Sequence, residues 1–215
     1  MPTWLKDEYH RIRDRLSDEM TRNASHTPTC YDRQMMYECG ENKYLTVAAS
    51  YDGSFASTFH RPRYFIWLPH LLVHQIPCPA CKAAGREGVR GPVVYLTEHG
   101  FVDSPRRVVD IEDNLFIIGY RYRCPHPECG QTFQSWSDPI LGALPPAVAG
   151  QFTFRLTYRS GLTEQLATLL RETIRGGLGP QVFTTMIQAF HYCALISYVP
   201  SFYSWLSIAA AMVPY

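Results

Sequence analysis

The sequence predicts an α+β fold in which a small antiparallel β-sheet is followed by a helical hairpin and preceded by a separate N-terminal helix. Three observations support this prediction. Apolar residues repeat with helical spacing near the N-terminus, β-rich runs separated by turn residues fill the middle of the chain, and helical spacing returns after residue 160. Such a change of period along the chain is typical of folds that segregate helices from an antiparallel sheet.

Size and composition are those of a globular protein. The chain has 215 residues, of which 46% are hydrophobic and 18% charged, and this is enough for a sizeable core in one or two domains. The formal net charge of +1 does not by itself indicate a nucleic-acid partner. We divide the chain into an N-terminal helix and polar linker (1–60), a β domain (61–140), and a helical hairpin with an apolar tail (141–215).

The first predicted helix covers residues 5–20. Its apolar residues follow one another at intervals of three or four and so share one face: Leu5, Tyr9, Ile12 and Leu16. The rest of the helix is charged, which favours a helix that docks through this one face. Residues 21–60 are polar and lack a sustained period, so we expect a loop or linker there.

The predicted strands begin where the composition turns aromatic, near residue 61. Two β-rich runs on either side of Asp113 and Asn114 predict a hairpin, because turn residues separate them. Pro69 limits the first strand. The runs that we expect to form strands are 64–68, 92–100, 106–111, 115–124 and 131–136.

Two helices are predicted near the C-terminus, over 161–177 and 179–192, and the sequence "GGLG" joins them. The pair is either a helix-turn-helix or an ordinary αα-hairpin that packs on the β-sheet. The second helix carries no Arg or Lys, which argues against insertion into a major groove.

Four cysteines in two pairs predict a zinc site. Cys78 and Cys81 are two residues apart in "CPAC", and Cys124 and Cys129 enclose four residues in "CPHPEC". Zinc prefers four tetrahedral ligands, and both spacings lie in the range of structural zinc sites. The intervening strands bring the pairs together, so the small sheet is predicted to be a zinc ribbon. His126, inside the second pair, is an alternative ligand, and a redox Cys78–Cys81 dithiol is the alternative chemistry.

The predicted zinc is structural. Four thiolates close the coordination shell, whereas a catalytic zinc keeps an open position. No P-loop, dinucleotide-binding, nucleophile-elbow or H-E-x-x-H motif is present. Asp110, Glu112 and Asp113 are close in sequence, but a hairpin turn accounts for them. We therefore expect no enzymatic activity and no small-molecule substrate.

The expected function is nucleic-acid binding, with contacts from Arg106, Arg107, Arg121 and Arg123 on neighbouring antiparallel strands. The loop "KAAGREGVR" extends this predicted basic face. One alternative is a protein-interaction module that uses aromatic side chains: Tyr64, Phe65, Trp67, Tyr120, Tyr122, Phe133 and Trp136. A second alternative is a fragment of a larger enzyme.

The order "CPAC … PRRVVDIEDNLFIIGYRYRCPHPECGQTFQSW" resembles the zinc ribbons of transposases. Over residues 61–192 the chain is similar to a domain of unknown function found in fungal and animal proteins of transposon origin, with "FIWLP", "WSDP", "LTYRSG" and "GLGPQVF" as further matching features. The resemblance implies a mobile-element origin and a metal site formed by the four cysteines. It implies no catalytic residue.

We use the sequences near the two ends of the chain to predict the cellular localisation of the protein. The N-terminus is charged where a signal peptide would be apolar, and clustered cysteines in a reducing compartment favour metal over disulfides, so we expect an intracellular protein, with the nucleus included. The uncharged tail 193–215 is long enough to span a membrane, but Pro200 and the lack of flanking basic residues argue against it. A packed helix and an altered gene product are the other interpretations.

Overall fold

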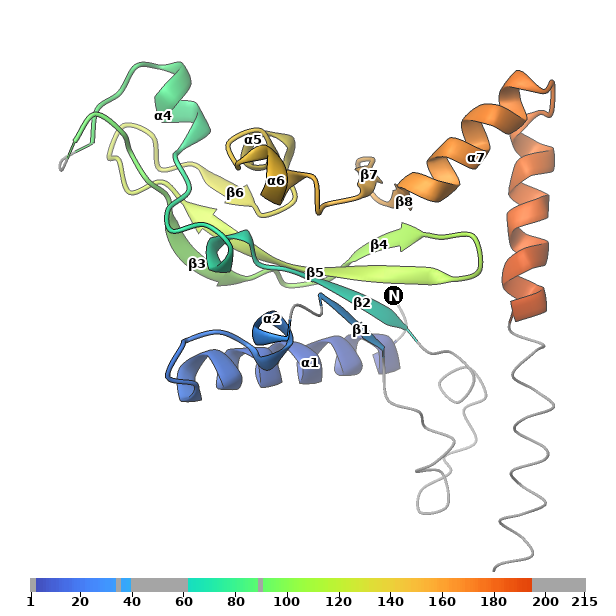
Figure 1. Ribbon diagram of the computed structural model, residues 1–215, viewed down its shortest axis with the longest axis horizontal. Coiled ribbons are helices and arrows are strands. Elements are labelled where there is room, and N and C mark those ends of the chain that lie inside the picture. Colours follow the sequence, from blue (N-terminus) through green and yellow to red (C-terminus); the bar gives the residue numbers. More distant parts are fainter. Residues whose placement is uncertain (1–2, 34–35, 40–61, 89–90, 195–215) are drawn as a thin grey trace, which may run out of the picture.

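One mixed β-sheet organises the computed structural model, which describes residues 3–33, 36–39, 62–88 and 91–194 (Figure 1). Its strands are β1 (Tyr37–Cys39), β2 (Arg63–Trp67), β3 (Thr97–Phe101), β4 (Arg106–Val109), β5 (Asn114–Arg123), β6 (Thr132–Gln134), β7 (Phe154–Leu156) and β8 (Gly161–Thr163). The main strand order is β1-β2-β5-β4-β8-β7, and β3 and β6 pair with β5 outside this path.

The helices are distributed around this sheet. They are α1 (Thr3–Arg22), α2 (Thr29–Asp32), the 3-10 turn η3 (Pro69–Leu71), α4 (Pro79–Ala83), α5 (Asp138–Leu141), α6 (Pro146–Ala149) and α7 (Glu164–Arg175). A further helix begins at Pro180 and is described to residue 194. The α+β class predicted from the sequence is confirmed.

The prediction of a small, wholly antiparallel sheet was wrong. Within the described residues the sheet has eight strands, and two of its pairs, β2 with β5 and β4 with β8, are parallel. The physical reason lies in the burial of β2 and the first half of β5, which is nearly complete on both faces. Strands buried on both faces are continuous apolar runs. The sequence of such a run does not indicate which strand it pairs with, or whether the pairing is parallel or antiparallel.

β5 is the central strand and changes partners halfway along. Its first half lies between β2 and β4, and its second half lies between β3 and β6. Gly119 stands at this change, where a Cβ atom would lie 2.3 Å from the ring of Trp136. The glycine therefore lets Trp136 pack directly on the backbone, and β5 leads from the large sheet into a three-stranded antiparallel ribbon.

One face of the sheet is covered by α1. The helix buries the four residues predicted to form its apolar face, Leu5, Tyr9, Ile12 and Leu16, so that prediction is confirmed. They pack against Ile66 and other apolar side chains of β2 and β5. The hydroxyl of Tyr9 also donates a hydrogen bond of 2.5 Å to the carbonyl of Val102, and burial raises the pKa of this phenol.

The opposite face carries a second core that the sheet itself encloses. Phe65 on β2 lies 4.8 Å from Phe154 on β7, measured between ring centroids, although three strands separate β2 from β7 in the sheet order. The sheet is therefore curled around this core. α5 supplies the fully buried Ile140, and the short elements between 137 and 163, which carried no prediction, complete the enclosure.

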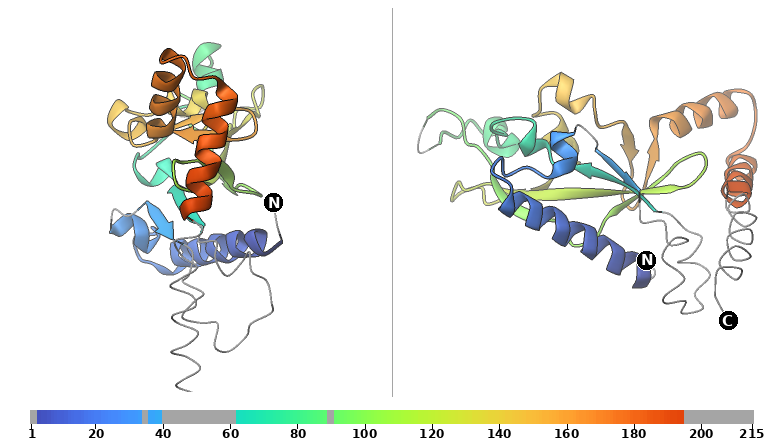
Figure 2. Two further views of the ribbon diagram at one scale, coloured as in Figure 1. Left: turned by 90° about the vertical axis from the view of Figure 1, so that its right-hand side faces the viewer. Right: turned by 60° about the horizontal axis from the view of Figure 1, so that its bottom comes forward.

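Helices are present at both predicted C-terminal positions, and they lie at the end of the sheet that carries the β4–β5 turn (Figure 2). Thr163 caps α7 by accepting a hydrogen bond from the backbone N–H of Leu166. Leu166, Phe183 and Ile187 form a small core with Val109 and Ile111 beside them. The two helices thus pack beside β4 and β8 of the large sheet.

All three predicted segments contribute strands to the one sheet, β1 from residues 1–60 and β7 and β8 from residues 141–215. The prediction that residues 21–60 are only loop was wrong at α2 and β1. The hydroxyl of Tyr31 on α2 donates to the carbonyl of Ile66 and accepts from the N–H of Leu68, which holds this segment on β2. Residues 40–61 of the linker and 195–215 of the apolar tail lie outside the described residues.

Candidate metal centre

Short turns hold each of the four cysteines at the end of the molecule where β5 finishes. Cys78 precedes α4 and Cys81 lies on it, with Pro79 at the first helical position. The N–H of Cys78 donates to the carbonyl of Val94 at 2.8 Å, and the N–H of Cys124 donates to the carbonyl of Gln131 at 2.8 Å. Backbone pairing with the neighbouring chain therefore fixes both cysteine turns.

The four sulfur atoms lie within 4.8 Å of one another. Cys78 Sγ is 3.9 Å from Cys129 Sγ, and Cys81 Sγ is 3.5 Å from Cys124 Sγ. A tetrahedral zinc ion with Zn–S bonds of about 2.3 Å requires sulfur separations of about 3.8 Å. The predicted grouping of Cys78, Cys81, Cys124 and Cys129 is thus present, and its size is compatible with one zinc ion.

The surroundings of the sulfurs also suit a metal centre. Three of the cysteines are buried and Cys129 is half-buried, and Val94 packs against them. The backbone N–H of Gln131 interacts with the sulfur of Cys129 and lowers the pKa of that thiol. Burial raises the pKa of the Cys81 and Cys124 thiols in the metal-free chain. Binding a metal here would replace buried S–H groups by coordinated thiolates and release their protons.

His126, the alternative ligand considered above, forms hydrogen bonds within the turn between Cys124 and Cys129. Its Nδ1 accepts a hydrogen bond of 3.2 Å from the N–H of Glu128, and its carbonyl accepts from the N–H groups of Cys129 and Gly130. The residue therefore stabilises the turn between the second pair of cysteines. Within the described ranges, the four cysteines are the only group of three or more Cys, His, Asp or Glu side chains that could hold a metal ion.

The four arginines predicted to bind nucleic acid occupy different surroundings. Arg106 and Arg107 point to opposite faces of β4, since neighbouring strand residues alternate. Arg106 donates to the carbonyl of Thr157, and Arg121 pairs with Asp103 at 3.2 Å. Arg123 is exposed, next to the cysteine cluster. The register places Arg106 opposite Ile117, roughly 13 Å along β5 from Arg121, so the four side chains do not form one face.

The aromatic residues considered for protein binding are mostly in the core. Five of the seven are buried: Tyr64, Phe65, Trp67, Tyr122 and Trp136. Tyr120 and Phe133 are half-buried. A buried side chain cannot bind a partner without unfolding, so this set does not form an interaction surface.

A polar network at the other end of β5 was not foreseen. Arg63 on β2 donates to Asp110 at 2.7 Å and to Asp113 at 2.6 and 3.0 Å. Asp110 also accepts from the hydroxyl of Thr163 at 2.7 Å, and its carbonyl is 2.9 Å from Nε2 of His191. The network therefore ties β2, the β4–β5 turn, α7 and the following helix together.

Charges in this network stabilise one another. Burial disfavours the charge on Asp110, but hydrogen bonds from Thr163 and Arg63 outweigh burial and lower the pKa of the carboxyl. Burial likewise disfavours the charge on Arg63, but Asp113 and Asp110 raise the pKa of the guanidinium. The carboxylates predicted to belong to a turn do lie there, and Asp110 and Asp113 also serve as partners for Arg63.

These features define an α+β protein with a curled mixed sheet and a candidate four-cysteine metal centre. The chain belongs to the DUF6729 family, a domain of unknown function, which matches residues 46–204. The match includes all four cysteines and β5, whereas α1 and β1 precede it. No curated protein and no solved structure matches the chain. No helix within the described residues is both long and apolar enough to cross a membrane.

Proposed function

We propose that the protein is a zinc-stabilised, non-enzymatic module that binds nucleic acid, is intracellular and derives from a mobile element. The observation that carries the proposal is the four-cysteine cluster, which supports a closed structural zinc site. The resemblance of the cysteine region to transposase zinc ribbons supports the origin and the class of partner.

Zinc would contribute stability where the hydrophobic core is thinnest. The apolar cluster at the cysteines contains only Val94 as a buried residue besides three of the cysteines themselves. Such a small core supplies little free energy, and structural zinc commonly supplies the remainder. Four sulfur ligands leave no open position for a substrate, so the proposed role of the ion is structural.

The cluster also positions two cations. Lys82 directly follows Cys81 and Arg123 directly precedes Cys124, and both side chains are exposed. Among the described residues, neither has a carboxylate partner. Arg123 therefore remains our main candidate among the four predicted arginines, while Arg106 and Arg121 already have protein partners.

An aromatic side chain lies on the same surface as Arg123. Thr97 on β3 pairs with Arg123, and its hydroxyl donates to the Arg123 carbonyl at 3.0 Å. Val94 is buried and Leu96 half-buried against the core, so Tyr95 and Thr97 face outward by strand alternation. Cations beside an exposed aromatic ring are a common arrangement at nucleic-acid interfaces, because they combine phosphate pairing with base stacking.

The test is salt-dependent binding of labelled DNA and RNA by the full chain. We expect Lys82→Ala and Arg123→Ala each to weaken binding and to reduce the slope of log affinity against log salt by about one. Arg159→Ala is the matched control, because Arg159 is an exposed cation in the turn between β7 and β8, away from the cysteines. No binding at low salt by the zinc-loaded protein would refute the proposal.

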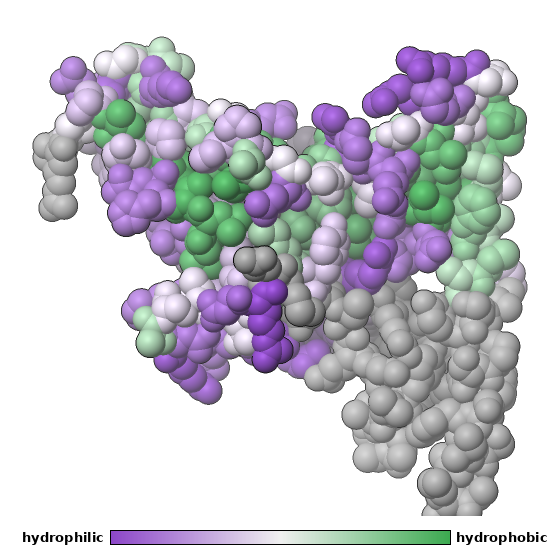
Figure 3. Space-filling model, in the orientation of Figure 1, coloured by the Kyte–Doolittle hydropathy of each residue, from purple (hydrophilic) through white to green (hydrophobic). Residues whose placement is uncertain are grey.

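A second candidate function is protein interaction through the C-terminal hairpin. Val182, Phe190 and Tyr192 are 54%, 43% and 63% exposed, and residues 176–215 contain no charged side chain. Figure 3 shows apolar residues along the helix that begins at Pro180. Exposed apolar surface of this kind is typical of interaction sites. Phe190→Asp should abolish partner binding if the hairpin is the site, without affecting nucleic-acid binding.

A further inference from the structure

A cavity lies beside the cysteine cluster, between α4 and the segment 92–95. Its volume is 380 Å³, within the range of about 300 to 1,000 Å³ that is usual for small-ligand sites. Apart from Cys78 and Val94, it is lined by two prolines, a valine, a tyrosine and two cations: Pro77, Pro92, Val93, Tyr95, Lys82 and Arg86.

The walls of this cavity are held in place by backbone pairing. Pro77 and Tyr95 form an antiparallel bridge, and the N–H of Leu96 donates to the carbonyl of Ile76 at 2.9 Å. On the other wall, Lys82 belongs to α4, and the N–H of Arg86 donates to the carbonyl of Cys81 at 3.0 Å. Both walls are therefore anchored to the cysteine turns.

The lining specifies the chemistry of a ligand. Val93 and Tyr95 are each 41% exposed, and together they offer an apolar surface that a flat group can cover. The charged residues that line the cavity, Lys82 and Arg86, are both cationic. A ligand that complements both features combines a flat apolar group with an anion, and a nucleotide has this combination.

We infer that the cavity receives one unpaired nucleobase of a single-stranded nucleic acid, which stacks on Tyr95 while its phosphate lies between Lys82 and Arg86. The inference rests on the proposed function and names its substrate. A base inside a duplex is stacked and paired, so it cannot enter a concave site, whereas bases of single strands are free to stack on aromatic side chains. Arg123, on the outward face that also carries Tyr95, supplies a contact to the neighbouring phosphate.

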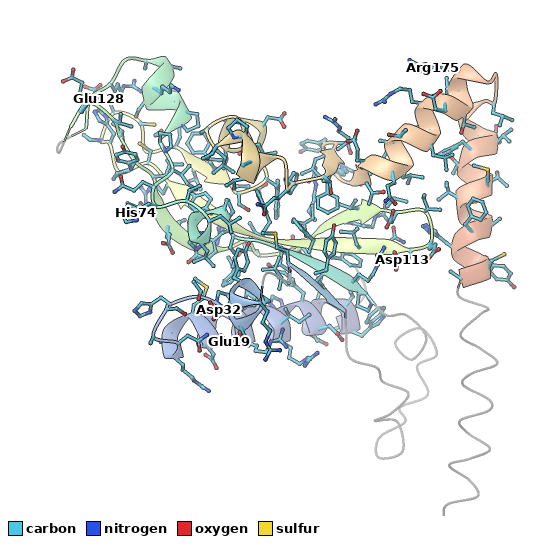
Figure 4. All side chains as sticks on the ribbon, in the orientation of Figure 1. Glu19, Asp32, His74, Asp113, Glu128 and Arg175 are labelled. Carbon is cyan, nitrogen blue, oxygen red and sulfur yellow. The ribbon has the colours of Figure 1, made fainter. Side chains whose placement is uncertain are left out.

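One carboxylate competes with the phosphate. Arg86 Nε is 3.5 Å from Glu128 Oε2, and the Glu128 side chain is largely exposed at the same corner of the molecule (Figure 4). An exposed ion pair of this kind is weak, so a phosphate can displace it. Glu128 thus lowers the affinity of the cavity for anions without closing it.

The experiment compares a short labelled single strand with the same sequence as a duplex, using fluorescence anisotropy on the zinc-loaded full chain. We expect the single strand to bind more tightly, and Tyr95→Ala to weaken that binding by about 5- to 150-fold, since stacking contributes about 1–3 kcal/mol per base. Tyr95→Phe should retain most of the affinity, because it keeps the ring. Tyr158→Ala is the control, since Tyr158 is 89% exposed and lies in the turn between β7 and β8.

Two results would overturn the inference. The first is equal affinity for single strand and duplex, with Tyr95→Ala behaving like Tyr158→Ala; if Lys82→Ala and Arg123→Ala still weaken binding, the proposed function survives and only the base site fails. The second is tighter binding of free thymidine monophosphate than of the strand, which would assign the cavity to a mononucleotide. Absence of all nucleic-acid binding would overturn the proposed function as well.

Glu128→Gln provides an independent test, because this substitution is expected to raise the affinity for the single strand. Removing the competing carboxylate should tighten single-strand binding by about two- to fivefold, the equivalent of one exposed ion pair. The matched control is Glu172→Gln, which removes a similarly exposed partner of Arg175 at the far end of α7. Unchanged affinity in Glu128→Gln would contradict a phosphate at Arg86.

Discussion

The two ends of β5 are stabilised in different ways. At its C-terminal end, four cysteines surround a space that fits one zinc ion, and the apolar core around them is small. At its N-terminal end, Arg63, Asp110, Asp113 and Thr163 satisfy one another by hydrogen bonds without any ion. Figure 4 labels Glu128 and Asp113 at these opposite ends. The first end therefore offers a site whose contribution to stability would depend on a bound ion, whereas the second is held by pairing between side chains of the chain itself.

The largest effect is expected from the cysteine end. Cys124→Ser should remove one ligand and with it most of the metal-dependent stability, which is on the order of 10 kcal/mol in small zinc sites. Circular dichroism and zinc content measure the loss. Cys193→Ser is the control, because Cys193 is exposed and distant in sequence from the cluster. Equal stability of the two variants would show that the four-cysteine site is dispensable.

Asp110→Ala should have the next largest effect and should not depend on zinc. It removes a partner of Arg63 and of Thr163, and we expect a loss of about 2–4 kcal/mol, reduced from the value for a fully buried pair because the Arg63 side chain is one-third exposed. Chemical denaturation measures this loss. Asp103→Ala, which breaks the exposed pair with Arg121, should cost less than about 1 kcal/mol. The account of this network fails if both variants lose the same amount.

The protein should lose stability below neutral pH because of His70. Burial lowers the pKa of this imidazole to about 4, and its Nδ1 lies 2.8 Å from the Tyr122 hydroxyl. The unfolded chain binds a proton near pH 6.5 and the folded chain does not, so stability is complete above that pH and falls as the pH decreases toward 4. The loss between pH 7 and pH 5 is about 2 kcal/mol.

Thermal unfolding across this pH range provides the measurement. His70→Gln should flatten the decrease, while His74→Gln, which changes an exposed histidine four residues away, should leave it unchanged. An identical pH profile in all three proteins would exclude His70 as the cause.

The smallest expected effect concerns α1. Tyr9→Phe removes the hydrogen bond to the Val102 carbonyl and should cost about 1 kcal/mol. Tyr158→Phe, at a largely exposed tyrosine, should cost nothing measurable. A larger loss in the Tyr158 variant would contradict the placement of α1 on the sheet.

The sequence predicted the two ends of β5 with unequal success. Cysteine has few roles in a reducing compartment, so two closely spaced pairs indicate a metal site even across many residues. Arginine and aspartate have many roles, and Arg63 lies 47 residues before Asp110, so nothing in the sequence links them. The helix at 5–20 was predictable because a single docking face imposes a period. The parallel pairing of β2 with β5 was not, because both strands are buried on both faces.

The most direct test of the central claim is the zinc content of the purified full-length protein. We predict one zinc ion per chain, bound by Cys78, Cys81, Cys124 and Cys129. A folded protein that contains no zinc, and takes up none when zinc is supplied, would contradict this account.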